Sequence, residues 1–272
     1  MIDVLMSTYN GAKFIEAQID SILTQDFQDL RLIVRDDGST DGTPDILEHY
    51  RLSDPRVEIV RDGIGNIGSA RSFLSLLEIS AADFFMFADQ DDIWLQGKIS
   101  SSLRKIEELS STYTRSVPTL IFTDLIVCDE NMNAMSNSLW RHQRLDPKIC
   151  RDWRRLLAQN VVTGSTIIGN AAARRASLPF VLKEMFHDHW VAVNVARVGV
   201  VDYQTTATIL YRQHSGNVEG AKNFNFRYAF RRLMRPRKRY EFYRRAGDFF
   251  GISSNRLLFT KIVESFRRII RR

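Results

Sequence analysis

Residues 84–94 (FFMFADQDDIW) constrain the fold of this chain more than any other stretch. Five apolar residues are followed directly by three carboxylates, those of Asp89, Asp91 and Asp92. A short apolar run of this kind is typical of a buried strand in a parallel sheet, and open α/β sheets bind ligands just beyond the carboxyl ends of such strands. Carboxylates this close repel one another unless a cation lies between them, and hard divalent cations prefer oxygen ligands. We therefore predict a metal-binding loop here; the alternative is a solvated loop in which Asp92 caps the next helix.

Apolar periodicity predicts that strands and helices alternate along most of the chain. Strands are expected at residues 2–6, 30–35, 57–60, 84–89, 119–127 and 206–210, and helices at 15–24, 44–50, 73–79, 96–109 and 191–198. Such alternation indicates an α/β fold with a mostly parallel central sheet, in which polar loops gather at one edge. Residues 129–150 are polar and irregular, and we interpret them either as an acceptor-side segment or as a structural connection.

The composition is that of a folded protein with reduced cysteines. A chain of 272 residues, 44% of them hydrophobic, can form one large α/β domain plus an appendage. Cys128 and Cys150 provide neither a disulfide framework nor a zinc-binding spacing, which favours a reducing cytosol. The first residues do not resemble a signal peptide, and no run reaches the roughly 18 apolar residues of a membrane span. We expect a soluble or peripheral protein.

The charge is divided unevenly along the chain. Residues 222–272 contain 16 Lys and Arg against three acids, whereas residues 1–221 contain 22 basic and 29 acidic groups. We therefore predict a domain at 1–221 and a basic tail at 222–272. In residues 255–272, apolar side chains occupy one helical face and basic ones lie mostly opposite, as in an interfacial membrane helix. The alternative is a tail packed on its own domain or on a second subunit, so a homodimer is left open; nucleic acid is disfavoured because the rest of the chain is acidic.

Residues 63–68 (GIGNIG) match the dinucleotide fingerprint G-x-G-x-x-G, and Asp89 follows about twenty residues later, as that fingerprint requires. However, the preceding strand alternates polar and apolar residues, and the match falls on the third strand–helix unit instead of the first. Two acidic loops would also repel a pyrophosphate in the absence of a metal. We therefore disfavour a nicotinamide cofactor.

Three ordered motifs resemble the signatures of glycosyltransferase family 2. They are residues 7–11 (STYNG), 35–43 (RDDGSTDGT) and 89–94 (DQDDIW). The resemblance covers roughly residues 1–221 and implies a GT-A fold, which is Rossmann-like, and inverting transfer of a sugar from a nucleotide diphosphate donor. Residues 187–190 (HDHW) and 211–218 (YRQHSGNV) are similar to those of bacterial rhamnosyltransferases that build O-antigen or cell-wall polysaccharide. This narrower likeness implies a dTDP-rhamnose donor and a lipid-linked acceptor; UDP-hexose and N-acetylhexosamine donors remain open.

The resemblance also implies roles for individual residues. Thr8, Tyr9 and Asn10 would bind the nucleoside, Asp37 the base, and Asp91 the Mg²⁺ or Mn²⁺ that bridges the diphosphate. The residues expected to bind the nucleotide or the sugar are Thr8, Tyr9, Asn10, Asp36, Asp37, Arg71, Asp89, Gln90 and Arg212, and the expected metal ligands are Asp91, Asp89 and His214. The alternatives are turn and capping roles for the loop aspartates, a surface role for Arg71 and a structural role for His214.

An inverting transfer needs one base to remove the proton of the acceptor hydroxyl. By resemblance that base is Asp188, whose alternative role is to cap the helix that follows. Residues 161–168 resemble the strand and tight turn that lie against the donor sugar in this family. Two further classes stay open, a metal-dependent nucleotidyltransferase and a non-catalytic carbohydrate-binding protein. A transferase with a lipid-linked acceptor would be cytoplasmic, peripherally associated with the cytoplasmic face of the membrane.

Overall fold

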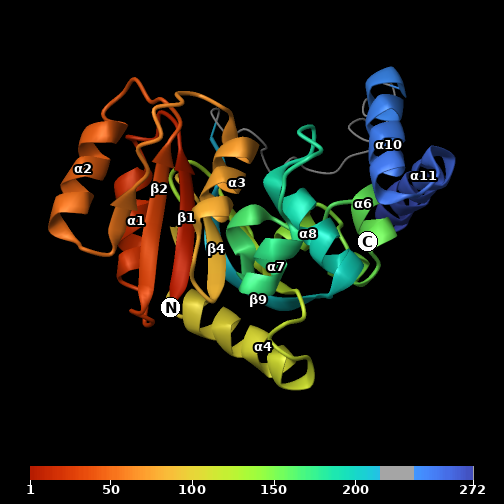
Figure 1. The fold of residues 1–272 in the computed structure, drawn as a ribbon, viewed down its shortest axis with the longest axis horizontal. Helices are drawn as coiled ribbons and strands as arrows, with labels where there is room; N and C mark the ends of the chain where they lie inside the picture. Colours follow the sequence, from red (N-terminus) through yellow and green to blue (C-terminus); the bar gives the residue numbers. More distant parts are fainter. Residues whose placement is uncertain (215–235, 272) are drawn as a thin grey trace.

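One mixed sheet organises the computed structural model, which describes residues 1–214 and 236–271 (Figure 1). The strands are β1 (Ile2–Thr8), β2 (Leu30–Asp36), β3 (Val57–Ile59), β4 (Phe84–Asp89), β5 (Ile93–Trp94), β6 (Thr119–Cys128), β7 (Ala134–Ser136), β8 (Ile167–Asn170) and β9 (Val200–Arg212). The helices are α1 (Ile15–Leu23), α2 (Thr43–Ser53), α3 (Ser69–Ile79), α4 (Lys98–Thr112), α5 (Leu139–His142), α6 (Trp153–Ala158), α7 (Ala171–Ala176), α8 (His187–Val198), α10 (Pro236–Phe250) and α11 (Ser254–Ile270), with 3₁₀ turns η1 (Pro147–Arg151) and η2 (Gly164–Thr166).

The first half of the sheet is parallel, as the sequence predicted. Its strand order is β3-β2-β1-β4, and all three pairings are parallel. The register pairs Thr8 with Asp36 and Ser7 with Asp89, so these three strands end level with one another. The three polar loops predicted from the sequence therefore start at the same edge of the sheet, which is the position for ligand binding in open α/β sheets.

The second half of the sheet is mixed, which corrects the expectation of a mostly parallel sheet. Beyond β4 the order is β8-β6-β9-β5, and β7 pairs with β6. Of the eight pairings among the described strands, four are parallel and four antiparallel. Between β6 and β8 the chain passes through β7, α5, η1 and α6, and η1 lies against the start of β9, where Arg151 pairs with Asp202. Strand β8 begins at the ligand edge and runs antiparallel to both its neighbours, β4 and β6.

Hydrophobic clusters cover both faces of the sheet, because side chains alternate between faces along each strand. In β1, Val4 and Met6 pack in the cluster beneath α1 and α4, whereas Leu5 packs in the cluster beneath α3 and α8. The second cluster continues into α10 and α11 through Tyr243 and Leu257. The C-terminal helices are thus joined to the core of the α/β fold.

Residues 129–150, which we expected to be irregular, contain β7, α5 and η1. Trp140 is buried, and its ring meets those of Phe122 and Tyr203 edge-on at 5.6 and 5.7 Å. This packing favours the interpretation of the segment as a structural connection. The role of its exposed residues toward an acceptor stays a prediction.

The C-terminal helices α10 and α11 lie beside α6, at the end of the molecule opposite α2 (Figure 1). The predicted boundary between residues 221 and 222 falls outside the described residues, so the two-part division stays a prediction. Among residues 1–214 and 236–271, every helix is too short or too polar to cross a bilayer.

Asp3 anchors the start of β1 with a buried carboxylate. It accepts hydrogen bonds from the hydroxyl of Ser80 at 2.8 Å and from the amides of Ala81 and Ala82 at 2.9 and 3.0 Å, and it pairs with Arg31. Burial alone would raise the pKa of Asp3, but these hydrogen bonds and the charge of Arg31 outweigh burial, so the pKa lies below its ordinary value of 3.8.

We predict that Asp3→Asn lowers the free energy of unfolding by roughly 2–4 kcal/mol at pH 7, because it leaves buried donors and a cation with a weaker acceptor. A carboxylate whose pKa is lowered by folding stabilises the protein above its unfolded pKa and loses that effect below it. The gap to wild type in urea unfolding should therefore narrow as the pH falls from 7 to 3. Glu58→Gln, at the exposed partner of Arg31, is the control and should change little; an equal loss in both variants would contradict the assignment.

Candidate active site

The loop after β1 is joined to the loop after β4 through Gln90. The side-chain oxygen of Gln90 accepts hydrogen bonds from the hydroxyl of Thr8 at 2.5 Å and from the amide of Tyr9 at 2.8 Å, and its amide group donates to the carbonyl of Tyr9 at 3.1 Å. Gly11 packs tightly against the same side chain, since a Cβ there would lie 2.4 Å from the Gln90 oxygen. The ring of Tyr9 is left exposed.

Asn10 joins the first loop to the loop after β2. It adopts a left-handed conformation with φ of 49°, its amide donates to the Ser39 hydroxyl, and its side-chain oxygen accepts from the Thr40 amide, both at 2.8 Å. Asp36 accepts from the amide and hydroxyl of Ser39. Asp41 accepts from the amide and hydroxyl of Thr43 at the start of α2, which is the turn role given above as the alternative for the loop aspartates. The two loops predicted to bind the nucleoside form one connected unit.

Arg35 and Asp37 form a buried ion pair that holds the glycine-rich loop 63–68. The guanidinium of Arg35 donates to Asp37 at 2.5 Å, to Asp62 at 2.7 Å and to the carbonyl of Gly65 at 2.9 Å. The Asp37 carboxylate also accepts from the amides of Ile67 and Gly68, both at 2.8 Å. The amides that would bind a pyrophosphate in a dinucleotide fingerprint are thus bonded to a carboxylate, which agrees with our rejection of a nicotinamide site.

Asp89, Asp91 and Asp92 crowd together at the end of β4. Burial and then the charges of Asp91 and Asp188 raise the pKa of Asp89 to about 7, while the hydroxyl of Ser165 opposes the shift. Burial and the charges of Asp91 and Asp89 raise the pKa of Asp92 well above its ordinary range. A nearby cation would relieve this repulsion and keep the carboxylates ionised.

Asp92 does not cap a helix, so that alternative is wrong. Helix α4 begins only at Lys98, after Gly97 in a left-handed conformation. Instead, Asp92 is fully buried, and one of its oxygens accepts from the amide of Arg212 at 3.2 Å. Trp94 is buried, and its ring lies 4.6 Å from the ammonium of Lys98. Burial lowers the pKa of Lys98 to about 7, although the charge of Asp92 opposes this shift.

The end of β9 supplies two nitrogen-bearing side chains to the same place. His214 Nε2 lies 2.8 Å from a carboxylate oxygen of Asp91. The guanidinium of Arg212 donates to the carbonyl of Asp91 at 3.0 Å and to that of Glu130 at 2.7 Å. Both side chains contact the ring of Phe14, Arg212 at 4.6 Å and His214 at 4.8 Å. The structure thus brings Asp91, Arg212 and His214 together, and their chemical role stays a prediction.

The donor atoms of Asp91 and His214 suit a divalent cation. Two neighbouring ligands of an octahedral ion, each at about 2.1 Å, lie about 3 Å apart, close to the 2.8 Å between these two atoms. Carboxylate oxygen and imidazole nitrogen are both accepted by Mn²⁺-type ions, with Mg²⁺ preferring oxygen. Within the described residues no group of three or more His, Cys, Asp or Glu side chains is arranged to hold a metal, so phosphate or water oxygens would have to complete the shell.

Asp188 reaches this cluster from α8. It lies in the first turn of the helix, whose N-cap is Phe186, so the alternative role of Asp188 as a helix cap is wrong. Its carboxylate accepts from the side-chain amide of Asn160 at 3.3 Å and from the amide of His189 at 2.6 Å. Its charge contributes to the raised pKa of Asp89, so it lies within electrostatic reach of the end of β4.

The two histidines beside Asp188 are neutral and structural. Burial lowers the pKa of His187 to about 3, and its ring stacks on Phe73 at 4.1 Å and presses against Gly164. Burial likewise lowers the pKa of His189 to about 4, and its Nε2 lies 2.9 Å from the carbonyl of Leu156. Neither is arranged to act as a base at neutral pH, which leaves Asp188 as the base candidate on this helix.

Ser165 of η2 lies beside Asp89 and Asp92, within the segment 161–168 that we expected against the donor sugar. Two other residues at the site were not predicted from the sequence: Phe14 underlies Arg212 and His214, and Asn160 bonds Asp188. Each acts across a large sequence separation, and no local pattern identifies such a contact. Arg71, which we predicted to reach the phosphates, is exposed in the first turn of α3.

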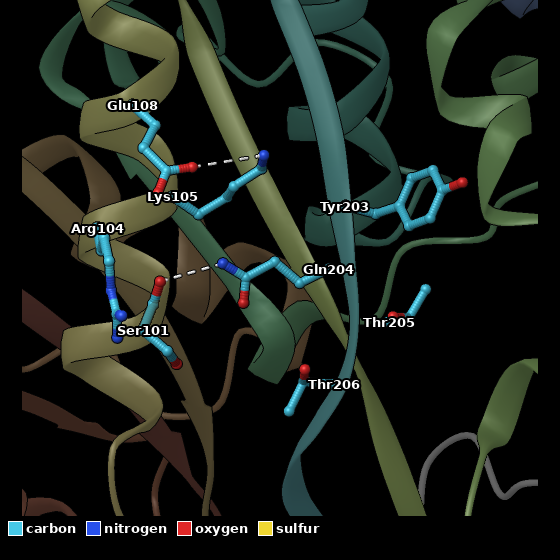
Figure 2. A pocket seen from close by; sticks show the side chains of 8 residues that line it. All are labelled: Ser101, Arg104, Lys105, Glu108, Tyr203, Gln204, Thr205 and Thr206. Atoms are coloured by element: carbon cyan, nitrogen blue, oxygen red, sulfur yellow. Dashed lines mark hydrogen bonds and ion pairs between the residues drawn. The ribbon is translucent and has the colours of Figure 1, made fainter.

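A polar groove of about 470 Å³ lies elsewhere, between α4 and β9 (Figure 2). Gln204 donates to the carbonyl of Ser101 at 3.0 Å across it, and Lys105 pairs with Glu108 on its helical wall. Its strand residues end at Thr206, six residues before Arg212 and so about 20 Å away along β9. The groove is separate from the carboxylate cluster.

Comparison with known proteins identifies the family. The sequence profile described as Glycosyl transferase family 2 matches residues 3–146, more than half of the chain. The chain therefore belongs to glycosyltransferase family 2.

Two relatives match most of this chain at a low sequence identity. The dTDP-rhamnosyl transferase RfbG of Shigella flexneri is 27% identical over 241 residues, which are 84% of this chain and 78% of that protein. The UDP-Glc:alpha-D-GlcNAc-diphosphoundecaprenol beta-1,3-glucosyltransferase WfaP of Escherichia coli is 24% identical over 230 residues, 82% of this chain and 81% of that protein.

Solved structures show the fold. Residues 1–349 of TarS from S. aureus, in complex with UDP-GlcNAc, superpose with a TM-score of 0.62 at 18% identity, covering 89% of this chain; this chain spans only 64% of that one. The mannosyltransferase PcManGT from Pyrobaculum calidifontis, in complex with GDP-Man and Mn²⁺, gives a TM-score of 0.60 at 15% identity, covering 97% of this chain and 73% of that one. The expectation of a GT-A fold is confirmed.

We predict that Gly11→Ala weakens nucleoside diphosphate binding by roughly tenfold or more, about 1.4 kcal/mol. The added methyl group would displace Gln90 and break its bonds to the loop after β1. Gly42→Ala is the control, because a Cβ there meets only Ala12 at 3.8 Å. Titration calorimetry with UDP, GDP and dTDP measures the effect; equal affinities for both variants would show that the Gln90 contacts do not shape the site.

Proposed function

We propose that the protein is an inverting glycosyltransferase that moves a sugar from a nucleotide diphosphate donor to a hydroxyl group of a growing bacterial surface polysaccharide. The observation that carries the proposal is the convergence of Asp188 and His214, from two distant segments, on the carboxylates at the end of β4. Family membership and the fold support the same reaction class.

The nucleoside would bind at the joined loops after β1 and β2, with Thr8, Tyr9 and Asn10 around it and Asp36 ordering the turn. The exposed ring of Tyr9 offers a surface on which a base can stack. A carboxylate has about four lone-pair sites, and those of Asp37 already accept from Arg35, Ile67 and Gly68. One acceptor site is left for the base, so Asp37 would bind the base while fixing the loop beside it.

The diphosphate would lie between the end of β4 and the end of β9. Arg212 and the exposed Arg71 supply positive charge, and Gln90 positions the loop. Asp91 and His214 would hold Mg²⁺ or Mn²⁺ beside Asp89, and phosphate or water oxygens would complete the shell. When bound, that cation neutralises the diphosphate and stabilises it as a leaving group.

Asp188 would act as the single base. Its carboxylate takes the proton of the acceptor hydroxyl as the oxygen attacks the anomeric carbon on the face opposite the diphosphate, which inverts that carbon. Asn160 and the amide of His189 orient the carboxylate. By resemblance, the turn η2 would lie against the donor sugar, and its Ser165 lies beside Asp89.

The donor we favour is dTDP-rhamnose, supported by the similarity to RfbG over most of both chains. A UDP-hexose or UDP-N-acetylhexosamine is the second candidate, supported by the similarity to WfaP and by the UDP-GlcNAc complex of TarS. A lipid-linked acceptor is supported by the diphosphoundecaprenol substrate in the name of WfaP. Such an acceptor would place the protein peripherally at the cytoplasmic face of the membrane.

The test is release of nucleoside diphosphate from a panel of sugar nucleotides with and without Mg²⁺ or Mn²⁺, since many transferases slowly hydrolyse their donor in the absence of an acceptor. Turnover of one donor that requires the metal would identify both the class and the sugar. The absence of calorimetric binding to every donor would refute the proposal.

We predict that Asp188→Asn lowers turnover of the accepted donor by roughly 10²–10⁴-fold, the usual contribution of a general base, and leaves donor affinity unchanged. Asp248→Asn, an exposed carboxylate on α10, is the matched control and should retain full turnover. Loss of donor affinity in Asp188→Asn would instead assign this residue to binding.

We predict that His214→Ala raises the Mn²⁺ concentration needed for half-maximal turnover by roughly 10–100-fold. Loss of a residue that only hydrogen-bonds to a metal ligand weakens metal binding by this factor, and loss of a ligand itself should weaken it at least as much. Manganese titrations of turnover, and calorimetry of Mn²⁺ with bound nucleoside diphosphate, measure the change. His49→Ala, at an exposed histidine of α2, should behave as wild type. An unaltered metal requirement in His214→Ala would assign this histidine a purely structural role.

A further inference from the structure

Helix α11 is packed with its apolar face outward. Its exposed large apolar side chains are Phe259, Ile262, Phe266 and Ile270, which are 67%, 51%, 62% and 63% exposed. Their spacing of three and four residues places them on one side of the helix; we call this set the α11 stripe. The buried positions are instead Leu257, Glu264 and Arg268. An ordinary surface helix of a globular protein shows the opposite arrangement.

Polar contacts fix this orientation. Glu264 is buried and pairs with Arg155 of α6 at 2.8 Å. Arg268 donates to the carbonyl of Gln143 at 2.6 Å, and Lys261 donates to the side chain of Gln159 at 2.6 Å. Rotating the helix to bury the α11 stripe would break these contacts and leave Arg155, Gln143 and Gln159 without the partners they have now, which costs free energy. The stripe therefore stays on the surface.

Charge indicates what covers the stripe. The exposed side chains of Arg256 and Arg267 lie along one side of it, and the sequence from residue 222 onward contains 16 basic groups against three acids. Anionic lipid headgroups are complementary to such an apolar stripe with basic edges. A second copy of the chain is less suitable, because a two-fold contact through this face would bring like charges together.

We infer that the α11 stripe is a membrane-docking surface that inserts into the headgroup region of an anionic bilayer, while the polar face of the helix stays bonded to the α/β fold. Helix α11 packs on α6, and α6 packs on α8, which bears Asp188 (Figure 1). Docking would thus place the bilayer on the side of the proposed base and away from α2. That docking would bring Asp188 toward a lipid-linked acceptor rests on the proposed function, whereas the docking surface itself is independent of it.

The experiment is co-sedimentation of the full chain with vesicles of phosphatidylcholine alone and of phosphatidylcholine mixed with phosphatidylglycerol. Wild type should bind the mixed vesicles, with binding that weakens as salt is added. Phe259→Ser/Phe266→Ser should lower the partition coefficient by roughly tenfold or more, since it removes most of the inserted apolar surface. Leu52→Ser/Ile79→Ser, which changes two exposed apolar residues on α2 and α3, should bind as wild type does.

Arg256→Gln/Arg267→Gln should weaken binding to the mixed vesicles only. Failure of wild type to bind mixed vesicles, or equal binding by the stripe variant, would overturn the inference. A wild-type dimer in sedimentation velocity that the stripe variant converts to a monomer would also overturn it, in favour of a second copy. Donor turnover without vesicles should be equal in wild type and the stripe variant, so failure of docking and failure of the proposed reaction are observed separately.

Discussion

The structure of the site depends on the repulsion among carboxylates at the end of β4. Asp89, Asp91 and Asp92 follow a strand that is buried on both faces, so water cannot fully screen their charges. Groups at the end of β9 partly offset this repulsion. The backbone amide of Arg212 donates a hydrogen bond to Asp92, and the imidazole of His214 lies against the carboxylate of Asp91. The contacts with these carboxylates therefore help to fix the end of β9 beside the end of β4. A metal bound together with a diphosphate would complete the neutralisation of the carboxylate charges.

The sequence predicted the first half of the fold well because local patterns determine it. Apolar runs located β1, β2 and β4, and the acids and short polar residues that follow each run located the ligand edge. The direction of β8 was not predictable, since it depends on the path of residues 129–166, which have no strong period. The roles of Asp92 and Asp188 as helix caps were wrong for a related reason: α4 starts later and α8 earlier than their apolar residues indicate.

The contacts that complete the site lay beyond sequence reasoning. Phe14 and Asn160 are ordinary residues locally, and their importance arises only when distant segments meet. The sequence showed the amphipathic pattern of the last helix, but it did not determine which face of that helix points outward. The ion pair of Glu264 with Arg155, which lies about a hundred residues earlier, and the contacts of Lys261 and Arg268 decide that orientation.

Gln90 stands between Asp89 and Asp91 in the chain and is bonded to the loop that would hold the nucleoside. A shift of that loop would move Gln90 and, with it, the carboxylates on either side. The base and the phosphates of a bound donor would then act on one connected unit, so that selection of the nucleotide and assembly of the charged centre would be coupled through this side chain.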